Sequence, residues 1–220
     1  MKYILIDLDG TITNPKIGIT KSVQYALKHF NIQIEDLNSL CKHIGPPLRE
    51  GFIEYYGFSE EEAEQAVKKY REYYEVTGIY ENEEYEGIEE LLRKLKVAGK
   101  TMIVATSKPE KFAKKVIEYF HLEEYFDDIC GSNLDSSRAE KAEVIHYALE
   151  KNGITDLSQV VMVGDRKYDI MGAKIEGIAS VGVLYGFGSP EELIEAGADQ
   201  IVATVENLYD VLMDENNWNK

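Results

Sequence analysis

The stretch Tyr3-Ile4-Leu5-Ile6-Asp7-Leu8-Asp9-Gly10-Thr11 passes from a short apolar run into two aspartates and a glycine. The run Tyr3–Ile6 is typical of a strand buried on both faces, as in a parallel sheet. In open α/β sheets ligands bind beyond the carboxyl ends of the strands, so the residues after this run are candidate site residues. Asp9 stands two positions after Asp7, and in an extended chain both carboxylates therefore point to the same side.

Three further apolar runs have the same character and lie at residues 101–105, 160–163 and 180–183. Helical spacing of apolar residues separates them, in segments 88–98, 112–120 and 142–149, and Ser189-Pro190 begins another helix with a capping serine. Strands that alternate with helices predict a doubly wound α/β fold with a parallel, Rossmann-like sheet.

The segment from residue 14 to residue 85 breaks this alternation because it contains no strand-like run. Its clearest helix signal is Ser59, a capping residue followed by three glutamates. A crossover between parallel strands usually needs only one helix, so the extra length predicts an inserted helical subdomain. We therefore expect an α/β core of residues 1–14 and 86–220 and an α-helical cap of residues 15–85.

Two other predicted strands also end in polar residues. Thr106-Ser107-Lys108 follows the run 101–105, and Gly164-Asp165 follows the run 160–163, with Asp169 shortly after. If these strands are neighbours, their ends bring several carboxylates, hydroxyls and a lysine to one edge of the sheet. Crowded carboxylates repel one another unless a cation lies among them, and hard oxygen ligands suit Mg²⁺.

These residue types supply the parts of a phosphoryl transfer. A carboxylate can attack phosphorus to form an acyl-phosphate, and we expect Asp7 to be this nucleophile. Asp9 is placed to protonate the leaving alkoxide and then to activate water, and Gly10 permits the turn that follows. Mg²⁺, Thr106 and a lysine then neutralise charge on the transferring phosphoryl oxygens.

Four motifs in this order resemble the haloacid dehalogenase superfamily and, within it, the phosphoglycolate phosphatase-like branch. They are Ile6-Asp7-Leu8-Asp9-Gly10-Thr11-Ile12, Val104-Ala105-Thr106-Ser107-Lys108-Pro109, Arg138-Ala139-Glu140-Lys141-Ala142 and Val163-Gly164-Asp165-Arg166-Lys167-Tyr168-Asp169-Ile170. Together they cover nearly the whole chain. The resemblance implies a Mg²⁺-dependent phosphatase for a small phosphate ester, with a small α-helical cap between the first two motifs.

The resemblance also implies a role for each matching acidic residue. Asp7 is the nucleophile and a metal ligand, and Asp9 is the general acid and base, with its backbone carbonyl on the metal. Asp165 is a direct metal ligand, and Asp169 supports the site from close by. The expected metal site therefore consists of Asp7, Asp9, Asp165 and Asp169.

On the substrate side, the resemblance gives Thr106 and Lys141 to the phosphoryl group. Lys108 is a rival phosphate lysine because it is nearer the hydroxyl motif, whereas Lys141 opens a helix whose amino terminus favours anions. Ser107 stands where relatives often carry asparagine, and its backbone N–H still suits phosphate. The segment Ile44-Gly45-Pro46-Pro47-Leu48 resembles the loop through which such caps touch substrate. The expected substrate-binding residues are Gly10, Thr11, Ser107, Lys108, Gly45 and Arg49.

The formal net charge of −16 argues against nucleic acid as a partner, because nucleic-acid binding favours basic surfaces. The amino-terminal segment lacks the basic start of a signal peptide, and no apolar stretch has the length of a membrane span. Cys41 and Cys130 show no metal-ligand spacing and are expected to be reduced thiols. We expect a cytoplasmic protein, a monomer or weak homodimer, without nucleic-acid or membrane partners.

The natural substrate is not fixed by these residues. Phosphoglycolate and nucleoside 5′-monophosphates are the candidates that the resemblance favours. A phosphomutase of the same superfamily would keep Asp7 and Asp9 but return the phosphoryl group to a sugar, and pyrophosphate hydrolysis is a further variant. A non-catalytic sensor of phosphate ligands is the alternative from a different class, and the complete set of catalytic residue types argues against it.

Overall fold

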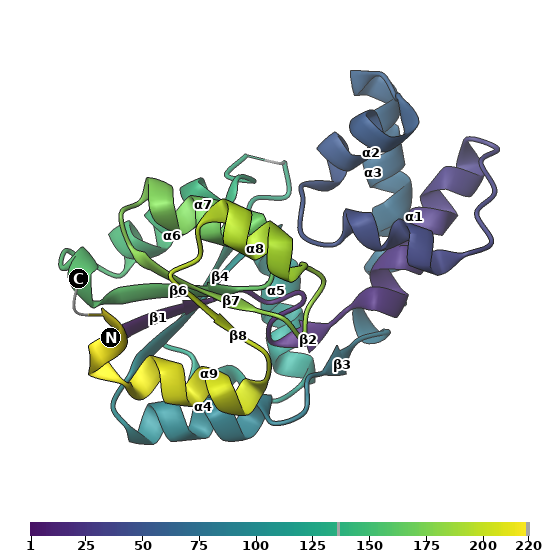
Figure 1. Cartoon of the computed structure of the whole chain (residues 1–220). Coiled ribbons are helices and arrows are strands. Elements are labelled where there is room, and N and C mark those ends of the chain that lie inside the picture. Colours follow the sequence, from purple (N-terminus) through teal and green to yellow (C-terminus); the bar gives the residue numbers. More distant parts are fainter. Residues whose placement is uncertain (136, 219–220) are drawn as a thin grey trace. The chain divides into compact units, whose positions relative to one another are not determined.

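The computed structural model describes residues 1–135 and 137–218, which form two compact units (Figure 1). The α/β unit contains residues 1–13 and the chain from Glu84 onward, and the helical unit contains Asn14–Glu83. These divisions lie one and two residues before the expected ones, after residues 14 and 85. Two short strands, β2 (Thr13–Asn14) and β3 (Glu83–Glu84), pair with each other where the chain passes between the units.

The α/β unit is built on a sheet of six parallel strands in the order β5-β4-β1-β6-β7-β8. The strands are β1 (Tyr3–Ile6), β4 (Thr101–Pro109), β5 (Asp128–Ser132), β6 (Val160–Gly164), β7 (Ala179–Val183) and β8 (Gln200–Val202). The strand order reverses at β1, and such a switch point is where doubly wound sheets bind ligands. The doubly wound, Rossmann-like fold expected from the sequence is confirmed.

The register of the sheet brings the three polar strand ends together. Ile6 of β1 lies beside Val104 of β4 on one side and Val163 of β6 on the other. The residues that follow these positions are therefore neighbours at the carboxyl edge. The strand expected at residues 101–105 is longer in the structure. β4 continues to Pro109 through an irregular stretch in its pairing with β5.

Helices cover both faces of this sheet, with α6, α7 and α8 on one face and α4 and α9 on the other (Figure 1). The α6 and α7 face buries aliphatic side chains of the strands, including Leu5, Ile103 and Met162, against Val144 of α6. The helices are α4 (Ile88–Val97), α5 (Glu110–Tyr119), α6 (Lys141–Lys151), α7 (Lys167–Ile175), α8 (Pro190–Ala196) and α9 (Val205–Met213), with short 3-10 turns at Glu123–Tyr125, Leu157–Gln159 and Glu215–Trp218.

The helical unit contains α1 (Lys16–His29), α2 (Leu48–Tyr56) and α3 (Glu60–Tyr74), with 3-10 turns at Leu37–His43 and Gly78–Tyr80. Ser59 caps α3 as expected, and Glu62 completes the capping box. Gly18 of α1 packs so closely on Gly78 that a Cβ at Gly18 would lie 1.9 Å from the Gly78 carbonyl oxygen. Glycine at position 18 therefore allows this close approach of two backbone segments.

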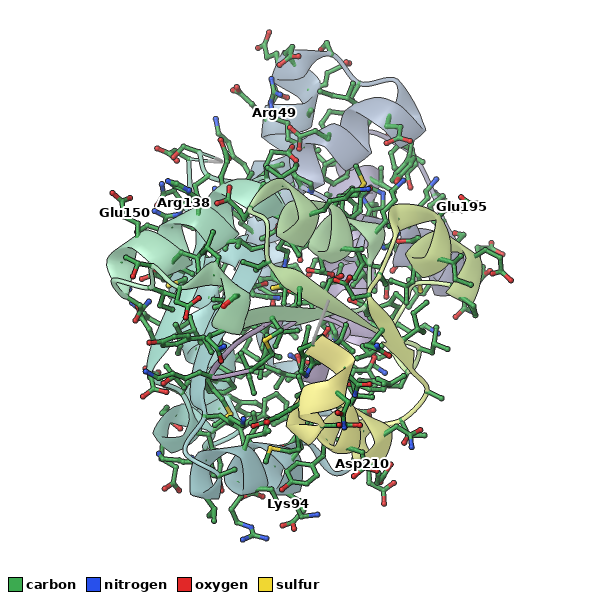
Figure 2. All side chains as sticks on the ribbon, turned by 60° about the vertical axis from the view of Figure 1, so that its left-hand side comes forward. Arg49, Lys94, Arg138, Glu150, Glu195 and Asp210 are labelled. Atoms are coloured by element: carbon green, nitrogen blue, oxygen red, sulfur yellow. The ribbon has the colours of Figure 1, made fainter. Side chains whose placement is uncertain are left out.

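The charged residues lie mostly on the surface. Lys94, Glu150, Glu195 and Asp210 are exposed and point away from the sheet (Figure 2). Cys130 is buried and Cys41 is half-buried, and both are free thiols. Among the described residues, no helix combines the length and the apolar character needed to span a bilayer. The charged side chains that are buried instead gather at the carboxyl edge of the sheet.

Candidate active site

Asp7 and Lys141 form a buried ion pair at this edge. Asp7 directly follows β1, and Lys141 is the first residue of α6. The Lys141 Nζ donates hydrogen bonds to Asp7 Oδ1 at 2.7 Å and to the Ala105 carbonyl at 3.0 Å, and it lies 2.8 Å from Asp169 Oδ1. Burial by itself lowers the pKa of Lys141, but the carboxylates of Asp169 and Asp7 outweigh it and the pKa is raised. Lys141 is therefore a cation held between two carboxylates.

Three of the four expected metal residues lie together. Asp7, Asp165 and Asp169 each offer an oxygen, and these oxygens lie within 4.8 Å of one another. Burial, together with the charges of Asp169 and Asp7, raises the pKa of Asp165 well above its ordinary value. Burial raises the pKa of Asp169 to about 6, against the attraction of Lys141. Lys141 pairs with two of these three buried carboxylates, Asp7 and Asp169, and a divalent cation would compensate the remaining charge.

The Asp165 side chain has one oxygen engaged and one without a partner. Its Oδ2 accepts a hydrogen bond from the Phe187 N–H at 2.7 Å. Its Oδ1 is buried and has no hydrogen-bond partner in the described part of the chain. A buried carboxylate oxygen without a partner is costly, and an oxygen-seeking ion such as Mg²⁺ would satisfy it. The carboxylates present therefore fit a Mg²⁺ site.

Asp9 is not a member of this group of three carboxylates, and it pairs with the rival lysine, Lys108. Asp9 Oδ2 is 2.5 Å from Lys108 Nζ, and both side chains are largely buried. Burial raises the pKa of Asp9, and Lys108 opposes that rise. Gly10 has φ of +92° and packs so tightly that a Cβ there would lie 2.2 Å from Asp165 Oδ2. Gly10 thus turns the chain and admits the Asp165 carboxylate beside it.

The hydroxyl motif is supported from β5. Thr106 is buried, and its Oγ1 accepts a hydrogen bond from the Lys108 N–H at 3.3 Å. The Ser132 hydroxyl donates to the Ser107 carbonyl at 2.8 Å. The Thr11 hydroxyl is fully buried and has no hydrogen-bond partner among residues 1–135 and 137–218. The predicted substrate-binding residues of the core therefore lie around Asp7 and Asp9, and their contact with substrate stays a prediction.

Two of the predicted substrate-binding residues, Gly45 and Arg49, belong to the helical unit. Gly45 has φ of +107°, and Arg49 on α2 pairs with Glu60 and lies 3.9 Å from Glu50. Arg49 is thus held by carboxylates of its own unit. Its predicted meeting with a substrate anion stays a prediction, as does the assignment of this unit as a cap.

Sequence reasoning missed the segment 185–188, which follows β7 and reads Tyr185-Gly186-Phe187-Gly188. Its Phe187 N–H donates to Asp165 Oδ2, and its Tyr185 hydroxyl donates to the Thr11 carbonyl at 3.2 Å. The signal was present, because these residues stand just beyond the carboxyl end of a predicted strand and contain two glycines.

Comparisons with known proteins identify relatives over most of the chain. Residues 4–183 match the family described as haloacid dehalogenase-like hydrolases. A 5′-nucleotidase of Pseudomonas aeruginosa is 47% identical over 190 residues, which cover 86% of this chain and 86% of that protein. A phosphoglycolate phosphatase of Vibrio vulnificus is 28% identical over 221 residues, which cover 97% of this chain and 96% of that protein.

Two further similarities concern a kinase and a solved structure. The tyrosine-protein kinase PtkA of Mycobacterium tuberculosis is 34% identical over 214 residues, which cover 96% of this chain and 72% of that protein. The crystal structure of a predicted phosphatase from Clostridium acetobutylicum has a TM-score of 0.95 and 50% identity, covering 96% of this chain and 98% of that one.

Proposed function

This chain belongs to the haloacid dehalogenase-like hydrolase family and is a phosphoric monoester hydrolase, and we propose that it acts through a phosphorylated Asp7. The observation that carries the proposal is the buried contact of Asp7 with Lys141 beside Asp165 and Asp169. A nucleophilic carboxylate approaching a phosphate needs local positive charge, since both reactants are anions. Lys141 supplies one such charge directly at Asp7.

In the first half-reaction an Asp7 oxygen attacks phosphorus and the bond from phosphorus to the ester oxygen breaks. Asp9 gives its proton to the departing alkoxide, and burial, which raises the Asp9 pKa, favours the protonated form that this step needs. In the second half-reaction Asp9 takes a proton from water, and the water oxygen attacks phosphorus. Phosphate leaves and the Asp7 carboxylate is restored.

Mg²⁺ is the cofactor that we assign to Asp7, Asp165 and Asp169, with the Asp9 backbone carbonyl as a further ligand. When bound, Mg²⁺ neutralises charge on the phosphoryl oxygens. The side chains of this site have complementary tasks in orienting the phosphoryl group. Lys141 holds Asp7 in place, and Thr106 lies buried within β4, the strand beside β1, which Asp7 directly follows.

For the substrate we propose a small phosphomonoester, with nucleoside 5′-monophosphates first and phosphoglycolate-like esters second. The relative named 5′-nucleotidase is 47% identical, against 28% for the relative named phosphoglycolate phosphatase, and this difference supports the order. The helical unit would act as a cap that excludes water during the reaction, with Gly45 and Arg49 meeting the substrate.

The test is phosphate release from a panel of nucleoside 5′-monophosphates, phosphoglycolate, sugar phosphates and pyrophosphate, each with Mg²⁺ and with a chelator. We expect release that requires Mg²⁺ and is fastest with a nucleoside 5′-monophosphate. Isomerised sugar phosphate without free phosphate would indicate a mutase. Binding of phosphate esters without turnover would indicate a sensor, and release that persists in chelator would contradict the metal assignment.

A further inference from the structure

The segment Tyr185–Gly188, here called the 185–188 loop, contacts both Asp165 and Thr11, which stands in the turn after Asp9. The Phe187 N–H engages Asp165 Oδ2 at 2.7 Å, whereas Asp165 Oδ1 has no hydrogen-bond partner among the described residues. The two oxygens of this predicted metal ligand are therefore not equivalent. One is committed to the loop, and the other is left for an ion.

The two glycines of the loop lie against Asp165 at distances that only glycine allows. A Cβ at Gly186 would lie 2.3 Å from Asp165 Cβ and 2.4 Å from the Gly10 carbonyl oxygen. A Cβ at Gly188 would lie 2.0 Å from the Asp165 carbonyl oxygen. These neighbours are backbone atoms or the first carbon of a side chain, so they cannot move aside as a flexible side-chain end does. An alanine at either position would push the loop away from Asp165.

The loop is also attached to the segment that carries the nucleophile. The Tyr185 hydroxyl donates to the Thr11 carbonyl at 3.2 Å, and the Tyr185 ring packs edge-on against Tyr85 with centroids 5.1 Å apart. The loop therefore fixes Asp165 relative to the turn that follows Asp7 and Asp9. The contacts on Asp165 and Thr11 come from different residues of one short segment.

We propose that the 185–188 loop is a positioning element that makes Asp165 a one-oxygen ligand and so favours Mg²⁺ over Ca²⁺. This inference rests on the proposed metal site. Mg²⁺ demands near-ideal octahedral coordination and takes few carboxylate oxygens, whereas Ca²⁺ accepts carboxylates through both oxygens. The Phe187 N–H takes one lone pair of Oδ2, and the Gly10 and Gly186 backbones crowd the same oxygen, so Oδ2 is less accessible to Ca²⁺ than Oδ1. Oδ1 has no hydrogen-bond partner among the described residues and is the oxygen left for the ion.

The experiment compares Gly186→Ala with wild type by calorimetric titration with MgCl₂ and with CaCl₂, in the absence of substrate. Loss of an outer support of a metal ligand typically weakens binding by about 10–100-fold. We expect the Mg²⁺ dissociation constant of Gly186→Ala to rise by about tenfold or more, with a smaller change for Ca²⁺, so that discrimination between the ions falls.

Two matched variants separate this role from general damage. Phe187→Ala keeps the backbone N–H and should keep the wild-type preference for Mg²⁺. Gly153→Ala places a side chain at a residue with φ of +61° and no atom within 4 Å, outside this loop, so it strains the backbone without touching the site. It should lower the melting temperature and leave both dissociation constants unchanged.

If Gly186→Ala does not fold, Tyr185→Phe replaces it, because that variant removes only the hydroxyl on Thr11. It should weaken Mg²⁺ binding in the same direction, by a smaller factor. A folded Gly186→Ala, or in its place Tyr185→Phe, with wild-type constants for both ions overturns the inference. Where the wild type needs Mg²⁺ for phosphate release, that result overturns the loop's role alone; release that persists in chelator overturns the proposed metal site and the inference with it.

Discussion

The α/β unit and the helical unit bury polar side chains in two different ways. In the α/β unit Lys141 is buried as a cation that pairs with two buried carboxylates, Asp7 and Asp169. In the helical unit His43 is 2% exposed, and neither ring nitrogen has a hydrogen-bond partner in the described part of the chain. Its ring packs against Phe52, Tyr55 and Tyr56.

The difference distinguishes the candidate active site, which buries charged groups, from the core of the helical unit, which buries a neutral one. Buried charges are stable only when each has a partner. At the carboxyl edge the ion pairs of Lys141 with Asp7 and Asp169 supply these partners. His43 is accommodated by remaining neutral, and burial, with a smaller contribution from Lys42, lowers its pKa to about 4. The first arrangement is suited to chemistry, whereas the second is a packing arrangement whose stability depends on pH.

The largest expected effect comes from removing the nucleophile. Asp7→Asn should lower Mg²⁺-dependent phosphate release by at least about a thousandfold, because the amide neither attacks phosphorus nor carries charge toward a metal. Asp210→Asn, at an exposed position of α9, is the matched control and should release phosphate at the wild-type rate. An Asp7→Asn variant with substantial activity would refute the nucleophile assignment.

Removing the cation that Asp7 and Asp169 share should destabilise the folded state. Lys141→Met leaves Asp7 and Asp169 without the buried cation that contacts both, and such a loss typically costs about 3–5 kcal/mol of stability. Urea unfolding in metal-free buffer measures this, and added Mg²⁺ should recover part of the loss by binding the folded state. Lys94→Met, at an exposed position, should change stability by no more than about 0.5 kcal/mol. Equal stability of Lys141→Met and wild type would show that the carboxylates are not held by this lysine.

The second lysine should affect the rate more than the binding of substrate. Lys108 contacts Asp9 and holds its carboxyl group in place, so Lys108→Met should lower kcat by about a hundredfold while KM changes little, as expected when the acid–base group is misplaced. The loss should shrink for an aryl phosphate, whose leaving group needs no proton. A rise in KM at constant kcat would instead make Lys108 a phosphate-binding residue.

The smallest expected effect lies in the helical unit and concerns pH. A His pKa lowered from 6.5 to about 4 means that the unfolded chain binds a proton more readily below pH 6.5. Stability from this residue is therefore present above pH 6.5 and is lost as pH falls toward 4. Between pH 7 and pH 5 the loss should be about 2 kcal/mol.

Comparison of His43→Phe with wild type by urea unfolding at pH 7 and pH 5 isolates this contribution from the titrating carboxylates. The variant should show a weaker fall in stability by that amount, whereas His146→Gln, at an exposed position, should behave like wild type. An unchanged pH dependence in His43→Phe would mean that His43 finds a proton acceptor when it is charged.

The same contrast explains what the sequence could predict. Asp7, Thr106 and Asp165 were recognisable because each follows a buried apolar run, and the parallel sheet brings such ends together. β5 was missed because its apolar residues are only Ile129 and Cys130 between polar ends, and β8 because it has three residues.

Contacts that depend on loop geometry could not be predicted from the sequence. The pairing of Lys108 with Asp9 depends on how β4 continues past Thr106. The role of the 185–188 loop depends on distances between backbone atoms far apart in the chain. His43 gave no signal, because a buried neutral histidine and an exposed one look alike in sequence.

Capture of the phosphorylated enzyme tests most directly whether Asp7 is the nucleophile. The wild type is mixed with its best ester and Mg²⁺, quenched in acid during turnover, digested and analysed by mass spectrometry. The peptide containing Asp7 should carry one added phosphoryl group in the wild type and none in Asp7→Asn. Turnover without any phosphorylated peptide, or with the phosphoryl group on another residue, would contradict this assignment.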